Sequence, residues 1–293
     1  MKAKKIATVF AVLAVALYAI NIPLSKIFLS HVQPTMMAAL LYLGAGVGLL
    51  VYRLTTGRGK TEEPLTIKEF PYTFGMIILD IAAPILLMIG LKCSDSASAS
   101  LLNNFEIVAT SLIAFLVFKE NISPKLAIAI VLVTLASSIL GFEGSDSLQF
   151  NTGSLFVLGA ASCRGLENNC TRKLSGKSSV QITTIKGIFS GLGSLFVAVV
   201  IGEEVPGILW ILPVLLLGFA SYGLSINFYI LAQRELGAAK TSAYYSVAPF
   251  LGVTFSVLFL KEQPTVQFYI GLALMIAATY LIVRDTFSAP RIG

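Results

Sequence analysis

Long apolar runs separated by short polar segments dominate the chain. Each run is close to the roughly 20 residues that cross a bilayer as a helix. Because most connections are short, successive helices are expected to run antiparallel. The pattern predicts an all-α polytopic membrane protein with ten transmembrane helices near 6–29, 34–53, 70–91, 95–118, 124–142, 153–174, 179–201, 208–233, 237–260 and 265–284.

Composition and charge agree with that pattern. Of 293 residues, 56% are apolar and only 12% are charged, whereas soluble domains carry about 25% charged residues. The formal charge of +6 is spread loop by loop and not gathered on one face, so a nucleic-acid partner is not expected. Most lysines and arginines lie in alternate loops and at both termini, which predicts cytoplasmic termini and a multi-pass protein of a prokaryotic cytoplasmic membrane.

The two halves of the chain share a layout. Phe118-Lys119-Glu120 and Leu260-Lys261-Glu262 each end an apolar run that begins with small residues, and they lie 142 residues apart. The predicted units are residues 1–147 and 148–293, with five spans each. Because five is odd, the halves must enter the membrane from opposite sides, which is the inverted repeat of many secondary transporters.

Five ionisable residues fall well inside predicted spans: Asp80, Glu106, Arg164, Glu167 and Lys186. A lone charge at the centre of a membrane helix costs about 2.5–3.5 kcal/mol on insertion scales, so these residues should face a protein-lined interior. The functional interpretation is a substrate or proton site. The structural alternative is a set of charge pairs that only fixes helix packing.

Polar residues spaced three, four or seven apart share one face of a helix. Three spans carry such a stripe, which predicts one shared polar cavity. Tyr222, Tyr229, Tyr244 and Tyr245 could wall it, although the interfacial aromatic belt is the favoured interpretation for Tyr229 and for Tyr42. The stripes are Tyr18, Asn21 and Ser25; Asn103, Glu106 and Thr110; and Arg164, Glu167, Asn168 and Thr171.

Enzyme chemistry finds little support in the sequence. His31 is the only histidine and falls in a predicted external turn, so neither a histidine triad nor an HExxH zinc site is expected in the membrane. The chain has no phosphate-cradling GxxxxGK[ST] loop. We therefore expect no catalytic residue, no metal and no cofactor, with a gradient or exchange as the energy source.

The segment 18–26 and the two span ends at residues 118–120 and 260–262 resemble the drug/metabolite transporter superfamily, in its ten-span EamA-like branch. The resemblance implies inverted five-helix repeats around a central cavity, and transport of small metabolites, commonly export of amino acids. Tyr18 and Arg164 stand where that family often has tryptophan, and Ala19 where it has glycine. A cationic Arg164 disfavours a generic hydrophobic-drug cavity.

The leading functional prediction is a secondary transporter that moves a small polar or zwitterionic, amino-acid-like metabolite by alternating access, as an exporter. Arg164 or Lys186 would meet a carboxylate, and Glu167, Glu106 or Asp80 an amine or a proton. The expected partners are this small molecule, protons and the lipid bilayer, with a homodimer left open. The alternatives are a membrane scaffold or receptor that does not transport, and a lipid or nucleotide-sugar carrier.

Overall fold

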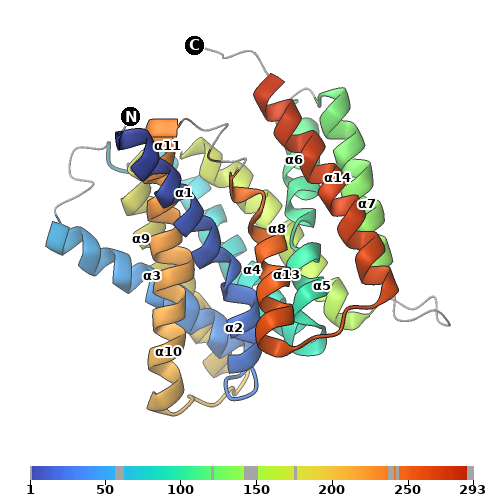
Figure 1. The fold of residues 1–293 in the computed structure, drawn as a ribbon. Coiled ribbons are helices and arrows are strands. Elements are labelled where there is room, and N and C mark those ends of the chain that lie inside the picture. Colours follow the sequence, from blue (N-terminus) through green and yellow to red (C-terminus); the bar gives the residue numbers. More distant parts are fainter. Residues whose placement is uncertain are drawn as a thin grey trace.

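The computed structural model describes residues 2–56, 63–119, 122–141, 151–174, 177–236, 241 and 244–288. Within that part of the chain every regular element is helical (Figure 1). The elements are α1 Lys2–Ala19, α2 Asn21–Phe28, α3 Pro34–Thr56, η1 Ile67–Glu69, α4 Phe70–Cys93, α5 Ser96–Leu102, α6 Phe105–Phe118, α7 Pro124–Gly141, α8 Thr152–Lys173, α9 Ser179–Val200, α10 Ile208–Gly218, the π-helix η2 Phe219–Leu224, α11 Ser225–Leu236, α13 Ala248–Leu260 and α14 Val266–Ser288.

Eight helical stretches in the described residues are long and apolar enough to cross a membrane. The predicted sixth span coincides with α8, which is too polar to be counted among them because it carries Arg164, Glu167 and two asparagines. The predicted ninth span coincides in part with α13, which has only 13 residues. The all-α polytopic fold is confirmed, and the number of ten spans stays a prediction.

Two of the spans predicted as single helices in the first half of the chain are interrupted. The 6–29 span turns at Ile20, between α1 and α2. Pro23 lacks the amide that would bond the carbonyl of Ala19, which accounts for this break. The 95–118 span turns at Asn103 and Asn104, between α5 and α6, and asparagine is a weak helix former. Such breaks are tolerated at membrane depth only where protein or a polar cavity surrounds them.

The principal helix contacts join the two halves of the chain: α4 packs along α8, α3 along α9, α7 along α14 and α1 along α11. Figure 1 shows α7 and α14 together at one edge of the molecule. The α3 and α9 backbones touch, since a Cβ atom added to Gly187 would lie 2.5 Å from Cα of Gly46. This close approach brings Tyr42 on α3 and Lys186 on α9 into one interior layer.

Charged side chains tie helix ends together on the side predicted to face the cell exterior. The Glu203 carboxylate accepts hydrogen bonds from the backbone amides of Thr35 and Met36 at 3.1 and 2.6 Å. The Glu262 carboxylate accepts from the first two amides of α5 at 2.8 and 2.9 Å. Lys26 donates to the carbonyls of Leu91 and Ser94 at the end of α4. Unpaired helix-end groups are thereby satisfied, and the helix ends are linked on this side.

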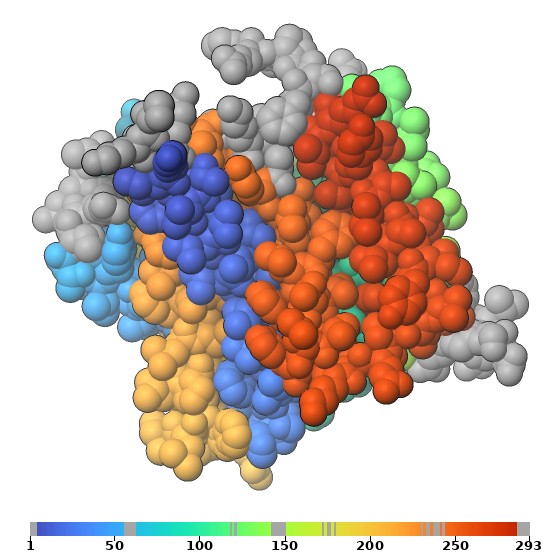
Figure 2. All heavy atoms as spheres, viewed as in Figure 1, coloured from blue at the N-terminus to red at the C-terminus, as the bar shows by residue number. Residues whose placement is uncertain are grey.

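The outer surface of the bundle is apolar. The space-filling view shows α1, α13 and α14 on one face of the molecule (Figure 2). Their outward side chains include Val9, Leu258, Ile270 and Ile276, all of which are exposed. A surface of this kind suits lipid, whereas the polar residues of α8 lie inside the bundle.

Candidate functional site

Two neighbouring cavities with shared lining residues lie between the halves. One has a volume of 170 Å³ and the other 600 Å³. They share five lining residues, which come from α1, α6, α8, α11 and the turn before α13: Tyr18, Glu106, Asn168, Ile226 and Tyr245. The larger cavity extends to Thr171 and Ile282, near the helix ends that are predicted to be cytoplasmic. The smaller cavity reaches deeper, to Asp80 and Lys186.

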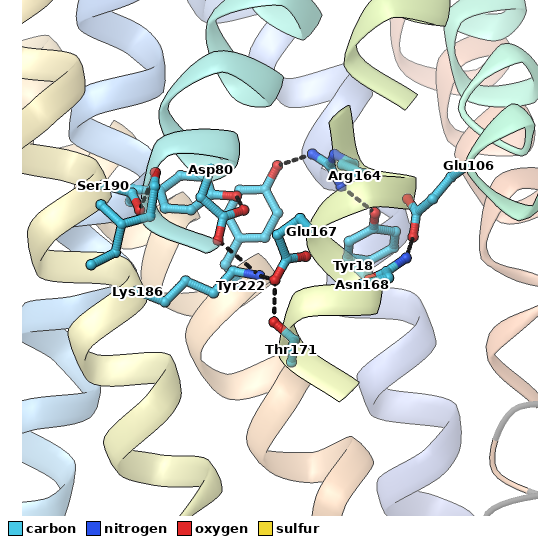
Figure 3. A network of polar contacts seen from close by, with 12 residues as sticks. Tyr18, Asp80, Glu106, Arg164, Glu167, Asn168, Thr171, Lys186, Ser190 and Tyr222 are labelled. Atoms are coloured by element: carbon cyan, nitrogen blue, oxygen red, sulfur yellow. Dashed lines mark hydrogen bonds and ion pairs between the residues drawn. The ribbon is translucent and has the colours of Figure 1, made fainter. Parts of the chain in front are cut away.

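The floor of the smaller cavity holds two carboxylates and one ammonium group. Lys186 Nζ lies 3.1 Å from Asp80 Oδ2 and 2.9 Å from Glu167 Oε1. Tyr42 donates a hydrogen bond of 3.0 Å to Asp80 Oδ1, and the Thr171 hydroxyl donates to Glu167 Oε1. Figure 3 shows Lys186 reaching between the two acids. We call Asp80, Lys186 and Glu167 the triad.

Arg164 lies on the same face of α8 as Glu167, one turn away, but it has different partners. Its Nη1 donates to Tyr18 Oη at 2.9 Å and its Nη2 to Tyr222 Oη at 3.2 Å (Figure 3). The residue is 8% exposed, and its Nε is buried with no hydrogen-bond partner. Among the described residues no carboxylate forms an ion pair with this guanidinium. Arg164 is therefore a buried cation whose hydrogen bonds go only to neutral hydroxyl groups, with its guanidinium carbon 5.9 Å from the centre of the Tyr222 ring.

Glu106 is the third carboxylate of the cavity. Its Oε1 accepts a hydrogen bond of 2.7 Å from the Asn168 amide, which also donates to Thr110 at 3.3 Å. Glu106 lies in the first turn of α6, where the helix dipole favours negative charge. The break at Asn103 and Asn104 places this helix start inside the bundle. Glu106 makes no ion pair with a described lysine or arginine.

Tyrosine rings connect the layers of the site. Tyr222, in the π-helix, contacts the Tyr42 and Tyr18 rings at centroid distances of 5.3 and 6.3 Å. Tyr18 in turn contacts Tyr245 at 5.2 Å, and Tyr245 contacts Tyr229 at 5.1 Å. The rings form a continuous wall from the triad to the larger cavity. π-helical turns are frequent at functional sites because they redirect side chains.

Ten of the twelve site residues predicted from sequence line one of the two cavities: Tyr18, Asp80, Asn103, Glu106, Arg164, Glu167, Asn168, Lys186, Tyr222 and Tyr245. Asn21 lies behind the wall, where its amide donates to Tyr222 Oη at 2.9 Å. Tyr244 lines neither cavity and is 38% exposed. Adjacent residues of a helix point in different directions, so Tyr245 faces the cavity while Tyr244 does not, and a role for Tyr244 in the site stays a prediction.

Two tyrosines for which the sequence favoured the interfacial belt line the cavities. Tyr42 is 5% exposed and bonds to Asp80, and Tyr229 lines the larger cavity. For Tyr42 the signal was its position inside the 34–53 run, between Ala38 and Gly46, on a face of small residues that a neighbouring helix could approach. Thr183 also lines the smaller cavity, and its sequence context carried no distinguishing signal.

Within the described residues no group of three or more histidine, cysteine, aspartate or glutamate side chains is placed to hold a metal ion. The polar groups of the site are instead suited to an organic molecule. They include carboxylates, a guanidinium, side-chain amides and phenol hydroxyls. Small-molecule sites combine such convergent polar groups with aromatic walls.

Known proteins resemble this chain over nearly its full length. An uncharacterized transporter of Methanothermobacter thermautotrophicus is 27% identical over 286 residues, covering 92% of this chain and 83% of the relative. The uncharacterized transporter YyaM of Bacillus subtilis is 23% identical, covering 92% and 90%. A solved crystal structure matches with a TM-score of 0.69 and 17% identity, over 98% of this chain and 99% of the other, which supports the fold.

The family comparison agrees with the resemblance noted in the sequence. The model of the EamA-like transporter family matches the chain twice, over residues 5–142 and 151–284. The two matches together cover most of the 293 residues. This chain belongs to the EamA-like transporter family.

Proposed function

We propose that this transporter moves a small zwitterionic, amino-acid-like metabolite across the cytoplasmic membrane by alternating access. The observation that carries the proposal is the buried guanidinium of Arg164, which donates only to two phenol oxygens and keeps Nε without a partner. A buried charge needs a counter-charge to offset its desolvation. A substrate carboxylate in the cavity would supply one, because guanidinium and carboxylate groups match in planar geometry.

The amine of the substrate would meet Glu106. Lys186 already contacts both Asp80 and Glu167, so these acids are less available than Glu106, whose described partner is a neutral amide. Arg164 and Glu106 both line the smaller cavity, on either side of Tyr18 (Figure 3). The sequence left two cations as candidates for the substrate carboxylate and three acids as candidates for its amine. The contacts favour Arg164 and Glu106.

Alternating access is supported by how the helices are built and paired. The two turns, at Ile20 and at Asn103 and Asn104, lie beside the cavities, as do the broken helices of other secondary transporters. Each main packing interface joins a helix of the first half to one of the second. We propose that the halves are inverted repeats that expose the cavity to each side in turn.

The proposed direction is export. The wider cavity ends near Thr171 and Ile282, at the predicted cytoplasmic side, whereas Glu203, Glu262 and Lys26 tie helix ends together at the opposite side. A metabolite made in the cell would enter the wider cavity first. Exchange or a proton gradient would supply the energy.

Thermal unfolding of the purified protein against amino acids, polyamines, nucleosides and sugars tests the substrate class, because a ligand of the folded state raises stability by RT ln(1 + [L]/Kd). We expect an upward shift with a zwitterionic amino acid. Arg164→Met should weaken that ligand about 10- to 100-fold, the equivalent of a lost charged hydrogen bond of about 1.5–3 kcal/mol. Lys92→Met, which removes an exposed cation outside the cavities, is the matched control.

Counterflow of the same radiolabelled amino acid in proteoliposomes then tests transport. Wild type and Lys92→Met should exchange it across the membrane, and Arg164→Met should not. An amino acid that binds equally well to Arg164→Met would refute the carboxylate assignment. Binding without counterflow would refute transport of that ligand and favour the scaffold or receptor interpretation.

A further inference from the structure

The triad carries more negative than positive charge. Asp80 on α4 and Glu167 on α8 are 1% and 3% exposed, and the single ammonium of Lys186 on α9 lies between them. With all three groups ionised the triad has a net charge of −1. An uncompensated buried charge is costly, so the triad has a place for one further positive charge.

The groups around Asp80 do not supply that charge. Tyr42 of α3 and Tyr222 of the π-helix are neutral phenols, and Tyr42 donates to Asp80 Oδ1. Arg164 of α8 is turned toward Tyr18 and Tyr222 and forms no ion pair with either acid of the triad. Among the described residues Lys186 is the one cation that contacts these carboxylates.

A proton fits this place better than a metal ion does. The lysine ammonium already occupies the position between the carboxylate oxygens, and hard metal ions need about six oxygen ligands, which the described residues do not gather here. Asp80 Oδ2 is buried and has no hydrogen-bond partner among the described residues. Its contact with Lys186 Nζ, at 3.1 Å, is an ion pair whose angles do not suit a hydrogen bond. Glu167 Oε1, in contrast, has both Lys186 and the Thr171 hydroxyl as partners.

We propose that the triad is the proton-binding site of the transport cycle, with Asp80 as the group that takes the proton. A hydronium ion in the cavity would give its proton to an Asp80 oxygen, forming an O–H bond and leaving water, while Lys186 stays an ammonium. The proton would return to water when the cavity opens to the other side. Arg164 and Glu106 remain available for substrate, so the two charges of the zwitterion and the proton have separate places.

The cavities give the proton a route to the triad. Asp80, Glu167 and Lys186 all line the 170 Å³ cavity, which shares residues with the 600 Å³ cavity. Both volumes hold several water molecules, because one water needs only about 10–15 Å³ of such space. Binding of the proton depends only on the triad. Its coupling to substrate movement rests on the proposed function.

Infrared difference spectroscopy in lipid nanodiscs, recorded between neutral and acidic pH, tests the site without any substrate. Acidification should produce the C=O stretch of a protonated carboxylic acid in the wild type. Asp80→Asn should lose that band, and Glu106→Gln, which removes the cavity carboxylate outside the triad, should keep it. The band unchanged in Asp80→Asn, or missing in the wild type, would overturn the proposal.

Asp80→Glu is a second variant that keeps the proposal testable if Asp80→Asn does not fold. It keeps a carboxyl group but changes its surroundings, so the band should remain and shift in frequency. An unshifted band in Asp80→Glu would assign the proton elsewhere and overturn the proposal.

Transport in wild-type proteoliposomes separates this inference from the proposed function. Amino-acid counterflow without a pH gradient tests transport alone. Net amino-acid flux that responds to an imposed pH gradient would support coupling through the triad. Counterflow that is indifferent to the gradient would overturn coupling and leave transport intact, whereas an Asp80-dependent band without counterflow of any amino acid would overturn the substrate class and keep the proton site.

Discussion

Replacing Lys186 should destabilise the protein far more than replacing Asp80, although the two side chains form one ion pair. Lys186→Met leaves two buried carboxylates, Asp80 and Glu167, with no cation in contact. Asp80→Asn leaves the Lys186 ammonium paired with Glu167, and the asparagine carbonyl can still accept the hydrogen bond of Tyr42. The first change makes the triad more negative, from a net charge of −1 to −2. The second change brings the net charge to zero.

The distances set the scale of the effect. At N to O separations of 3.1 and 2.9 Å, each contact is worth about 5–6 kcal/mol of Coulomb energy at an effective dielectric constant of about 20. Desolvation offsets much of this attraction, and breaking a buried pair by removing one partner costs about 3–5 kcal/mol. We therefore expect a loss of about 3–5 kcal/mol for Lys186→Met. For Asp80→Asn we expect about 1 kcal/mol, the net value of a hydrogen bond.

Reversible unfolding in mixed micelles of SDS and a mild detergent, followed by far-ultraviolet circular dichroism, measures both free energies. The double variant completes a cycle, and a coupling energy of about 0.5–3 kcal/mol is expected for residues in direct contact. Equal losses in the two single variants would refute the charge argument. A coupling energy near zero would show that the contact contributes nothing to folding.

Three further changes test other parts of the structure by the same unfolding assay. Tyr222→Phe removes the hydroxyl oxygen that accepts hydrogen bonds from Arg164 and Asn21. Leaving these two donors unpaired should cost about 1–3 kcal/mol of unfolding free energy. A loss below about 0.5 kcal/mol would show that water or another acceptor takes the place of the hydroxyl. Glu262→Gln replaces a carboxylate at the start of α5 and should cost about 0.5–1 kcal/mol, with faster exchange of the first two α5 amides. Gly187→Val should prevent stable folding because its Cβ would lie 2.5 Å from Gly46. Gly207→Ala is the control: no atom lies within 4 Å of the added carbon, so the variant should fold, at a cost of up to about 1 kcal/mol because Gly207 is the N-cap of α10.

The sequence predicts many of the residues that line the cavities, because a charge buried in the membrane is energetically costly. Arg164, Glu167 and Lys186 could not face lipid without a cost of several kcal/mol, so they had to meet in the interior. Helical spacing then predicted which residues share a helix face. In the structure, hydrogen bonds from Asn168 to Glu106 and from Arg164 to Tyr18 join the predicted stripes.

Hydrophobic periodicity could not predict the contact partners of the cavity residues or the breaks within the helices. Spacing assigns a residue to a face of its own helix but does not say which helix lies opposite, so Lys186 and Arg164 were equivalent candidates for a carboxylate. Tyr42 was ambiguous because tyrosine serves equally in interfacial belts and in polar cores. The turn at Asn103 and Asn104 is a local change in backbone conformation, which is tolerated because neighbouring helices and the cavity surround it. Hydropathy averaged over the length of a span does not detect so short a turn.

The stripe of α8 explains how one helix could serve both the proposed anion site and the proposed proton site. Arg164 and Glu167 are three residues apart, about 4.5 Å along the axis, yet the first contacts only hydroxyl groups and the second contacts Lys186. If Arg164 lay one turn nearer the triad, it would neutralise the second carboxylate, and neither an anion site nor a proton site would remain. The offset of one turn keeps the two charges apart. A movement of α8 relative to α4 and α9 would therefore alter both sites together, which is the coupling that a transport cycle requires.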